Sequence, residues 1–92
     1  MNTLLLYTTL GCHLCEQAEQ LLRPVLLHIN ASLGARGMAP LQLLSVEISE
    51  SAELVETYGM RIPVIRLRDS EAELGWPFDQ AQAFAFLSQQ LG

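Results

Sequence analysis

The spacing of apolar residues changes along the chain, and these changes predict its first elements. A short apolar run over residues 3–7 predicts a buried strand, and residues 8–11 supply the turn that ends it. A helix is expected next, because apolar residues then recur every three or four positions. Pro24 lies within this helix and is expected to kink it, since proline removes a backbone donor. The expected apolar stripe is Leu14, Ala18, Leu21, Leu22, Val25, Leu26 and Ile29.

The middle of the chain returns to a strand pattern after a segment rich in helix breakers. Glycines and a proline make residues 30–40 a predicted connecting loop. A largely buried strand is expected over residues 41–48, and the order strand, helix, strand predicts a βαβ unit with parallel strands. Ser49 or Ser51 then caps a short helix that runs through Tyr58 and ends at the following glycine.

The last third of the chain predicts a hairpin and a final helix. Pro63 opens a third strand over residues 64–68, and a turn leads into an antiparallel fourth strand over residues 71–75. The final helix is expected to start at Asp79, with Gln82 three residues later in capping-box spacing. The predicted order of elements is therefore β-α-β-α-β-β-α. The expected apolar stripe of the final helix is Phe84, Leu87 and Leu91.

Composition indicates a single domain and excludes several classes of partner. The chain has 92 residues, 50% of them hydrophobic, which suffices for one compact domain over residues 1–92. A net charge of −5, with arginine but no lysine, argues against nucleic-acid binding. No apolar run approaches the ~20 residues of a membrane helix, so no membrane partner is expected. Because residues 1–10 lack a basic signal region, we expect a cytoplasmic protein. We also expect a monomer.

Two cysteines, Cys12 and Cys15, are the residues with the clearest chemical potential. The loop they close is too short to stabilise a domain, so the spacing indicates redox chemistry or metal binding. Cys12 falls where a strand ends and a helix begins, and the positive end of a helix stabilises a thiolate. Cys15 lies close enough to attack a mixed disulfide formed at Cys12. His13, when protonated, adds positive charge beside them.

Two other functions fit the same cysteines. A zinc site normally has four ligands, and the chain offers only His13 and His28 besides Cys12 and Cys15. His28 is expected about four helical turns from Cys12, out of reach of a shared ion, which leaves an iron-sulfur cluster bridging two chains as the metal alternative. The third possibility is an interaction domain whose cysteines do not turn over.

A family resemblance favours the redox function. Gly11-Cys12-His13-Leu14-Cys15 after a first strand, Ile62-Pro63 at the third strand and the final ββα resemble the glutaredoxin-like branch of the thioredoxin superfamily over nearly the whole chain. The resemblance implies an α/β, thioredoxin-like three-layer fold with a four-stranded mixed sheet. It implies that Pro63 is a cis-proline beside the cysteines and that the backbone of Ile62 pairs with an extended substrate. Cys12 is then the nucleophile and Cys15 the resolving cysteine.

The sequence departs from this family at the positions that would hold glutathione. Thr9 replaces a lysine, Arg61 replaces the threonine of a Thr-Val-Pro motif, and residues 75–79 lack the usual glycine-rich motif. We therefore expect no bound cofactor, with glutathione as one candidate reductant. Arg61 and His13 join Ile62 and Pro63 as predicted substrate-binding residues. The predicted function is a thiol-disulfide oxidoreductase that acts on a protein or small-molecule disulfide and is rereduced by a cellular thiol.

The remaining cations and aromatic residues are expected to have structural roles. Arg66 and Arg68 lie two positions apart on one strand and are expected to form a solvated face with glutamates. His28 is expected to be partly buried or near a helix end. Packing is the expected role of Tyr7, Tyr58, Trp76 and Phe78.

Overall fold

A computed structural model describes residues 3–91 of the 92-residue chain. Within it, a four-stranded sheet has the strand order β2-β1-β3-β4. β2 is parallel to β1, whereas β3 is antiparallel to β1 and β4 is antiparallel to β3, so the sheet is mixed as predicted. The strands are β1 (Thr3–Thr8), β2 (Gln42–Glu47), β3 (Val64–Leu67) and β4 (Glu73–Gly75).

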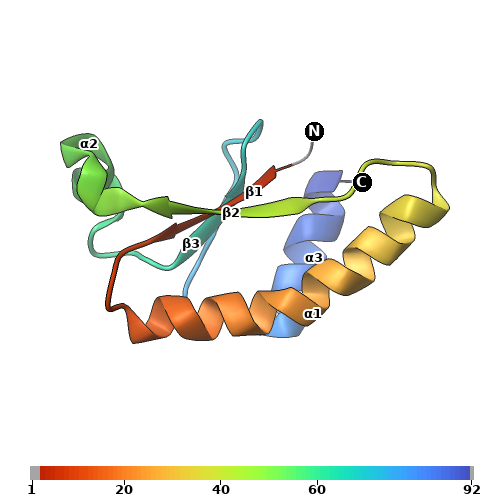
Figure 1. Cartoon of the computed structure of the whole chain (residues 1–92), viewed down its shortest axis with the longest axis horizontal. Helices are drawn as coiled ribbons and strands as arrows, with labels where there is room; N and C mark the ends of the chain where they lie inside the picture. Colours follow the sequence, from red (N-terminus) through yellow and green to blue (C-terminus); the bar gives the residue numbers. More distant parts are fainter. Residues whose placement is uncertain (1–2, 92) are drawn as a thin grey trace.

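Helices lie on both sides of this sheet, in the predicted three-layer order, and the short α2 lies near one end of the strands (Figure 1). The helices α1 (His13–Ala35) and α3 (Gln80–Leu91) pack on the face that carries Leu4 and Leu6. A 3-10 turn, η1 (Ile48–Glu50), and the short helix α2 (Ala52–Tyr58) pack on the opposite face. Successive side chains of β1 point to opposite faces of the sheet. Because each face is covered, β1 carries apolar residues on both of its sides. In the described part of the chain, no helix has the length and hydrophobicity needed to cross a bilayer.

The first helix is longer than the sequence predicts. We expected a loop over residues 30–40, but α1 continues to Ala35 and runs through Pro24. Leu33 is four residues beyond Ile29 and is buried, so the apolar stripe simply continues. The side chain of Asn30 accepts from the Leu41 N–H at 2.7 Å and donates to the Leu41 carbonyl at 3.1 Å. These bonds attach the end of α1 to the start of β2.

The second strand occupies an edge of the sheet, which corrects the prediction of a largely buried strand over residues 41–48. Within residues 3–91, β1 is the only strand that pairs with it, and Leu44 is 45% exposed. The apolar run that predicted burial extends into its flanks, where Leu41 and Ile48 are buried. The hairpin is also shorter than predicted, because β3 ends at Leu67 and β4 begins at Glu73.

The capping of the later helices agrees with the sequence. The Ser51 hydroxyl accepts from the Leu54 N–H at 3.3 Å at the start of α2. At α3 the predicted capping box is reciprocal: the Gln82 N–H donates to Asp79 Oδ1 at 2.7 Å, and the Asp79 N–H donates to Gln82 Oε1 at 2.9 Å. Both caps supply acceptors for backbone donors that a helix start leaves unpaired.

The buried face of α3 differs from the predicted stripe. Ala83 and Leu87 are buried, whereas Phe84 is 39% exposed. The ring of Phe84 instead contacts His28 of α1 edge-on, at a centroid distance of 5.2 Å. The prediction for His28 is therefore also wrong: it is exposed in the middle of the lengthened α1. Ala83 faces the core here, and the neighbouring Phe84 lies at the rim.

Candidate redox site

The predicted nucleophile lies at the start of α1. After β1 ends at Thr8, the chain turns through Gly11, whose φ of +76° lies in the left-handed region that glycine adopts without strain. Cys12 is the N-cap of α1, and its Sγ accepts a hydrogen bond from the Cys15 N–H at 3.1 Å. The sulfur therefore occupies the position of a capping oxygen at the positive end of the helix, where a thiolate is stabilised.

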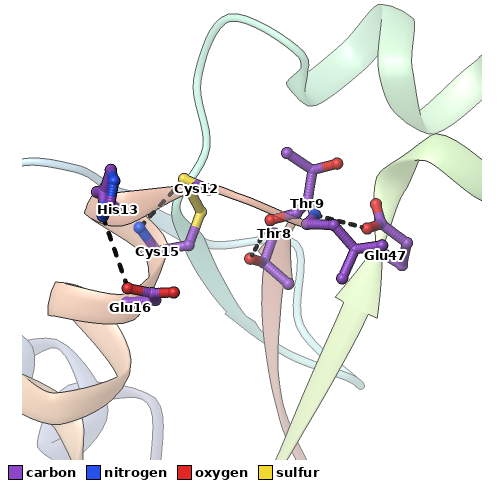
Figure 2. Close-up of a disulfide and its surroundings, with 8 residues drawn as sticks. Thr8, Thr9, Cys12, His13, Cys15, Glu16 and Glu47 are labelled. Atoms are coloured by element: carbon purple, nitrogen blue, oxygen red, sulfur yellow. Dashed lines mark hydrogen bonds and ion pairs between the residues drawn. A yellow bond between two sulfur atoms is a disulfide. The ribbon is translucent and has the colours of Figure 1, made fainter.

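Cys12 and Cys15 form a disulfide, with their Cα atoms 5.2 Å apart (Figure 2). The two sulfurs differ in access. Cys15, in the first turn of α1, is 4% exposed, whereas Cys12 is only half-buried. An approaching thiol or disulfide therefore meets Cys12 first.

A second loop, residues 59–63, lies at the same end of the sheet. The antiparallel register pairs Tyr7 with Val64, which sets Pro63 beside the carboxyl end of β1. Pro63 is buried, and the Ile62–Pro63 peptide bond is cis, as is the Trp76–Pro77 bond. The Ile62 N–H donates to the Tyr58 carbonyl at 3.0 Å. Within residues 3–91 the Ile62 carbonyl accepts no hydrogen bond.

Arg61, a predicted substrate-binding residue, is paired within the protein. Its Nη2 lies 2.6 Å from Glu73 Oε1, and its guanidinium lies over the Tyr58 ring, 5.3 Å from the centroid. The Tyr58 hydroxyl donates to the other oxygen of Glu73. Burial alone would raise the pKa of Glu73, but the hydrogen bonds from Tyr58 and Arg61 hold that pKa below its usual value. Burial and the Glu73 hydrogen bond raise the pKa of Tyr58.

Arg66 extends the same network and corrects the prediction of a solvated arginine face. It is half-buried and donates to the Tyr7 hydroxyl through Nε at 3.2 Å and Nη2 at 3.0 Å. The Tyr7 and Tyr58 rings stack at a centroid distance of 4.0 Å. Arg68 lies beyond the end of β3 and is exposed. We call Tyr7, Tyr58, Arg61, Arg66 and Glu73 the tyrosine-arginine cluster.

Glu47 is a residue of the site that the sequence analysis missed. It ends β2 directly opposite Thr8 in the parallel register. Its Oε1 accepts from the Leu10 N–H at 2.8 Å, and its Oε2 accepts from the Ser49 N–H at 2.9 Å. The hydrogen bonds from Ser49 and Leu10 hold the pKa of Glu47 below its usual value. The missed signal was an acidic side chain at the carboxyl end of a strand that neighbours β1.

Within residues 3–91, no basic side chain lines the hollow beside the disulfide. This hollow has a volume of about 160 Å³, and its lining contains hydroxyls and carboxylates. His13 is exposed, with Nδ1 3.7 Å from Glu16 Oε2. Within residues 3–91, no three His, Cys, Asp or Glu side chains cluster as metal ligands would. The polar lining residues of the hollow include Thr8, Thr9, Ser45, Glu16 and Glu19.

The packing roles predicted for Trp76 and Phe78 agree with the structure. Phe78 is buried in the core beneath α1 and α3, and the half-buried Trp76 packs against that core. Their rings meet edge-on at a centroid distance of 5.1 Å.

The layered fold, with a cysteine pair at the start of α1, defines a thioredoxin-fold protein with a dithiol site. The family model described as Glutaredoxin-like domain (DUF836) matches residues 3–88. Because the match covers nearly the whole described chain, the protein belongs to this glutaredoxin-like family. The family resemblance and the thioredoxin-like fold inferred from the sequence are confirmed.

Solved structures support the same assignment. The X-ray structure of Northeast Structural Genomics target protein XcR50 from X. campestris is 36% identical, with a TM-score of 0.70 and coverage of 94% of this chain and 96% of that one. A structure of a malarial protein is 16% identical, with a TM-score of 0.64 over 100% of this chain and 99% of that one. Chloroplastic thioredoxin z is 15% identical, with a TM-score of 0.62 over 100% of this chain and 80% of that one. The last two show the fold alone. No curated protein sequence matches the chain at a significant level.

Proposed function

We propose that the protein is a thiol-disulfide oxidoreductase in which Cys12 is the nucleophile and Cys15 the resolving cysteine. The observation that carries this proposal is the placement of the Cys12 sulfur as the N-cap of α1, half-exposed above the buried Cys15 to which it is bonded. This position favours a thiolate at Cys12 and restricts attack from solution to that sulfur. Cys15 is then available only to its neighbour.

The proposed reaction transfers two electrons from the reduced Cys12/Cys15 dithiol to a substrate disulfide. The Cys12 thiolate attacks one sulfur of the substrate disulfide, the substrate S–S bond breaks, and the departing thiolate takes a proton from water. Cys15, on losing its proton, attacks Cys12 Sγ and releases the second substrate thiol. The Cys12–Cys15 disulfide seen here is the product, and two equivalents of a cellular thiol return it to the dithiol.

The loop before Pro63 is the proposed site for the substrate backbone. The carbonyl of Ile62 supports this role, because it is unpaired within residues 3–91 and can accept an N–H from an extended substrate. The Ile62 N–H is already bonded to Tyr58, so we propose a single backbone bond here. Pro63 would pack beside the bound disulfide.

Two further side chains, His13 and Arg61, complete the proposed substrate site. His13 is exposed next to Cys12 and can meet an anionic or polar group of the substrate. Arg61 is the weaker of the two, because Glu73 already neutralises its guanidinium. A small anionic thiol such as glutathione therefore finds little charge to bind, and we propose that it acts as a reductant rather than as a bound cofactor.

The proposal includes a cytoplasmic setting and a monomeric state. A reducing compartment supplies the thiols that return the cysteine pair to the dithiol. Each residue named for the reaction comes from one chain, so the proposed chemistry needs no second copy.

A disulfide-reductase assay with two electron donors tests the function. The wild-type protein is expected to turn over a protein disulfide or a small-molecule disulfide with either glutathione or a thioredoxin system as donor. Cys12→Ser should abolish turnover, whereas Cys15→Ser should accumulate a mixed disulfide at Cys12 that mass spectrometry detects. Alkylation of the reduced protein across pH should give a Cys12 pKa below the free value of ~8.5. An inactive wild-type protein whose Cys12 titrates at or above that value would refute the proposal.

A further inference from the structure

The carboxylate of Glu47 connects the loop that precedes Cys12 to the turn that follows β2. Each of its oxygens accepts one backbone N–H: Leu10 at 2.8 Å on one side and Ser49 at 2.9 Å on the other. Figure 2 shows Glu47 at the end of β2 with its carboxylate facing the loop beside Thr9. The loop after β1 and the turn after β2 are thus held by the same side chain.

The loop before Cys12 has little else to hold it. The side chain of Leu10 is 90% exposed, so it contributes no buried apolar anchor. Gly11 has the conformational freedom of glycine and adopts a positive φ. Within residues 3–91, the bond to Glu47 is the only hydrogen bond from Leu10 or Gly11 to a residue distant in sequence. The carboxylate is therefore the main restraint on the two residues that precede the nucleophile.

We propose that Glu47 is a positioning residue for the Cys12–Cys15 redox pair. By fixing Leu10, its carboxylate holds the Cys12 sulfur against the Cys15 N–H and within bonding reach of the Cys15 sulfur. An ordered loop raises the effective concentration of one thiol at the other and so stabilises the disulfide relative to the dithiol. This role rests on the proposed function. The equilibrium between the Cys12–Cys15 disulfide and the dithiol can nevertheless be measured whether or not the protein turns over a substrate.

The test measures that equilibrium directly. Wild type and variants are equilibrated with dithiothreitol at set ratios of reduced to oxidised form, and alkylation followed by mass spectrometry gives the disulfide fraction. Glu47→Gln retains one acceptor oxygen and Glu47→Ala retains none. We expect the equilibrium constant for disulfide formation to fall about fivefold to tenfold in Glu47→Gln, and further in Glu47→Ala.

Two further variants separate positioning from charge. Glu50→Gln removes an equal charge from the same turn at a side chain with no hydrogen bond in the described chain, and it should leave the constant within about twofold of wild type. Glu47→Asp keeps the charge but is one methylene too short to reach both N–H groups, so it should lower the constant although the charge is unchanged. Urea unfolding of each oxidised variant confirms that the redox measurement is made on folded protein.

The results of these measurements decide whether Glu47 positions the Cys12–Cys15 pair. An equilibrium constant for disulfide formation within twofold of wild type in Glu47→Gln overturns the inference. A second pair of results also overturns it: a constant for Glu47→Asp equal to that of wild type, together with equal constants for Glu50→Gln and Glu47→Gln. An inactive wild-type protein with a Glu47-dependent equilibrium would leave the inference standing while the proposed function fails. If Glu47→Ala does not fold, the Gln and Asp variants decide the question.

Discussion

The two faces of the sheet are built by different forces. On one face, α1 and α3 bury a large apolar cluster that contains Leu4, Leu6 and Ile65. On the other, the short α2 covers a small cluster. There the tyrosine-arginine cluster joins α2 to β4 and β3 to β1 by hydrogen bonds, and α2 to β1 by the stacked rings of Tyr58 and Tyr7. Apolar burial is non-directional, whereas hydrogen bonds fix geometry. The first face therefore supplies most of the stability, and the second sets the position of the loop before Pro63.

The largest expected effect comes from the apolar face. Leu22 of α1 is 0% exposed, so Leu22→Ala should lower the free energy of unfolding by about 2–5 kcal/mol through lost burial and a cavity. Urea denaturation measures this loss. The disulfide equilibrium of the folded variant should equal that of wild type.

Leu27→Ala is the matched control for that substitution. Leu27 lies on the same helix and is 75% exposed, so its loss should cost no more than about 0.5 kcal/mol. Equal destabilisation by the two substitutions would show that the buried apolar residues of α1 are not what holds this helix on the sheet.

The next largest effect is expected on the hydrogen-bonded face. Glu73→Gln leaves both Arg61 and Tyr58 without their charged acceptor and should cost about 1–3 kcal/mol. Unlike Leu22→Ala, this substitution should also change the kinetics of substrate reduction, because Arg61 directly precedes Ile62 and Pro63 in the proposed substrate loop. A rise in KM with kcat unchanged would indicate altered binding, and unchanged kinetics would count against any link between the cluster and the site.

The contribution of Glu73 should depend on pH in a defined direction. The folded protein lowers the pKa of this carboxyl from its ordinary value of 4.5, so the unfolded chain binds its proton first as the pH falls. The stabilisation is therefore complete above pH 4.5 and is lost as the pH drops through the folded pKa. The difference in stability between wild type and Glu73→Gln should be constant near neutrality and shrink below pH 4.5, and urea titrations across that range measure it.

The sequence was sufficient for features set by short-range patterns. Helical spacing, the strand-to-helix turn and the capping box of Asp79 and Gln82 each depend on residues within a few positions of one another. The placement of Cys12 at the start of α1 follows from the same local signals. The error at the end of α1 was also local, because Gly34 suggested a loop while Leu33 continued the buried stripe.

Features that depend on contacts between distant residues were not predictable. Glu47 and Leu10 are 37 positions apart, and Arg61 and Glu73 are 12 apart, so no periodicity connects them. Arg66 resembled a solvated cation because the hydroxyl that accepts its hydrogen bonds belongs to Tyr7, 59 positions earlier. Strand order decides such pairs, and a single sequence gives the order of elements along the chain rather than across the sheet.

A smaller effect is expected from the tyrosine that links α2 to β4. Tyr58→Phe removes only the hydroxyl that donates to Glu73 and retains the ring that stacks on Tyr7. The cost should be about 0.5–1.5 kcal/mol, close to the net value of one hydrogen bond. Urea denaturation of this variant measures that cost, and a loss as large as that of Leu22→Ala would mean that ring packing, rather than the hydroxyl bond, had been disturbed.

The smallest effect is expected for an ion pair on the outer surface of α1. Arg23 and Glu19 lie one turn apart at 2.8 Å, with 67% and 40% of their side chains exposed. A double-mutant cycle should give a coupling of about 0.3–0.5 kcal/mol, because water and salt screen the pair. The same cycle on Arg61 and Glu73 should give a larger coupling that depends less on salt, since Glu73 is 23% exposed and Tyr58 holds its second oxygen. Equal couplings, with equal salt dependence, would mean that the tyrosine-arginine cluster is ordinary surface charge and that the contrast between the two faces is one of apolar area alone.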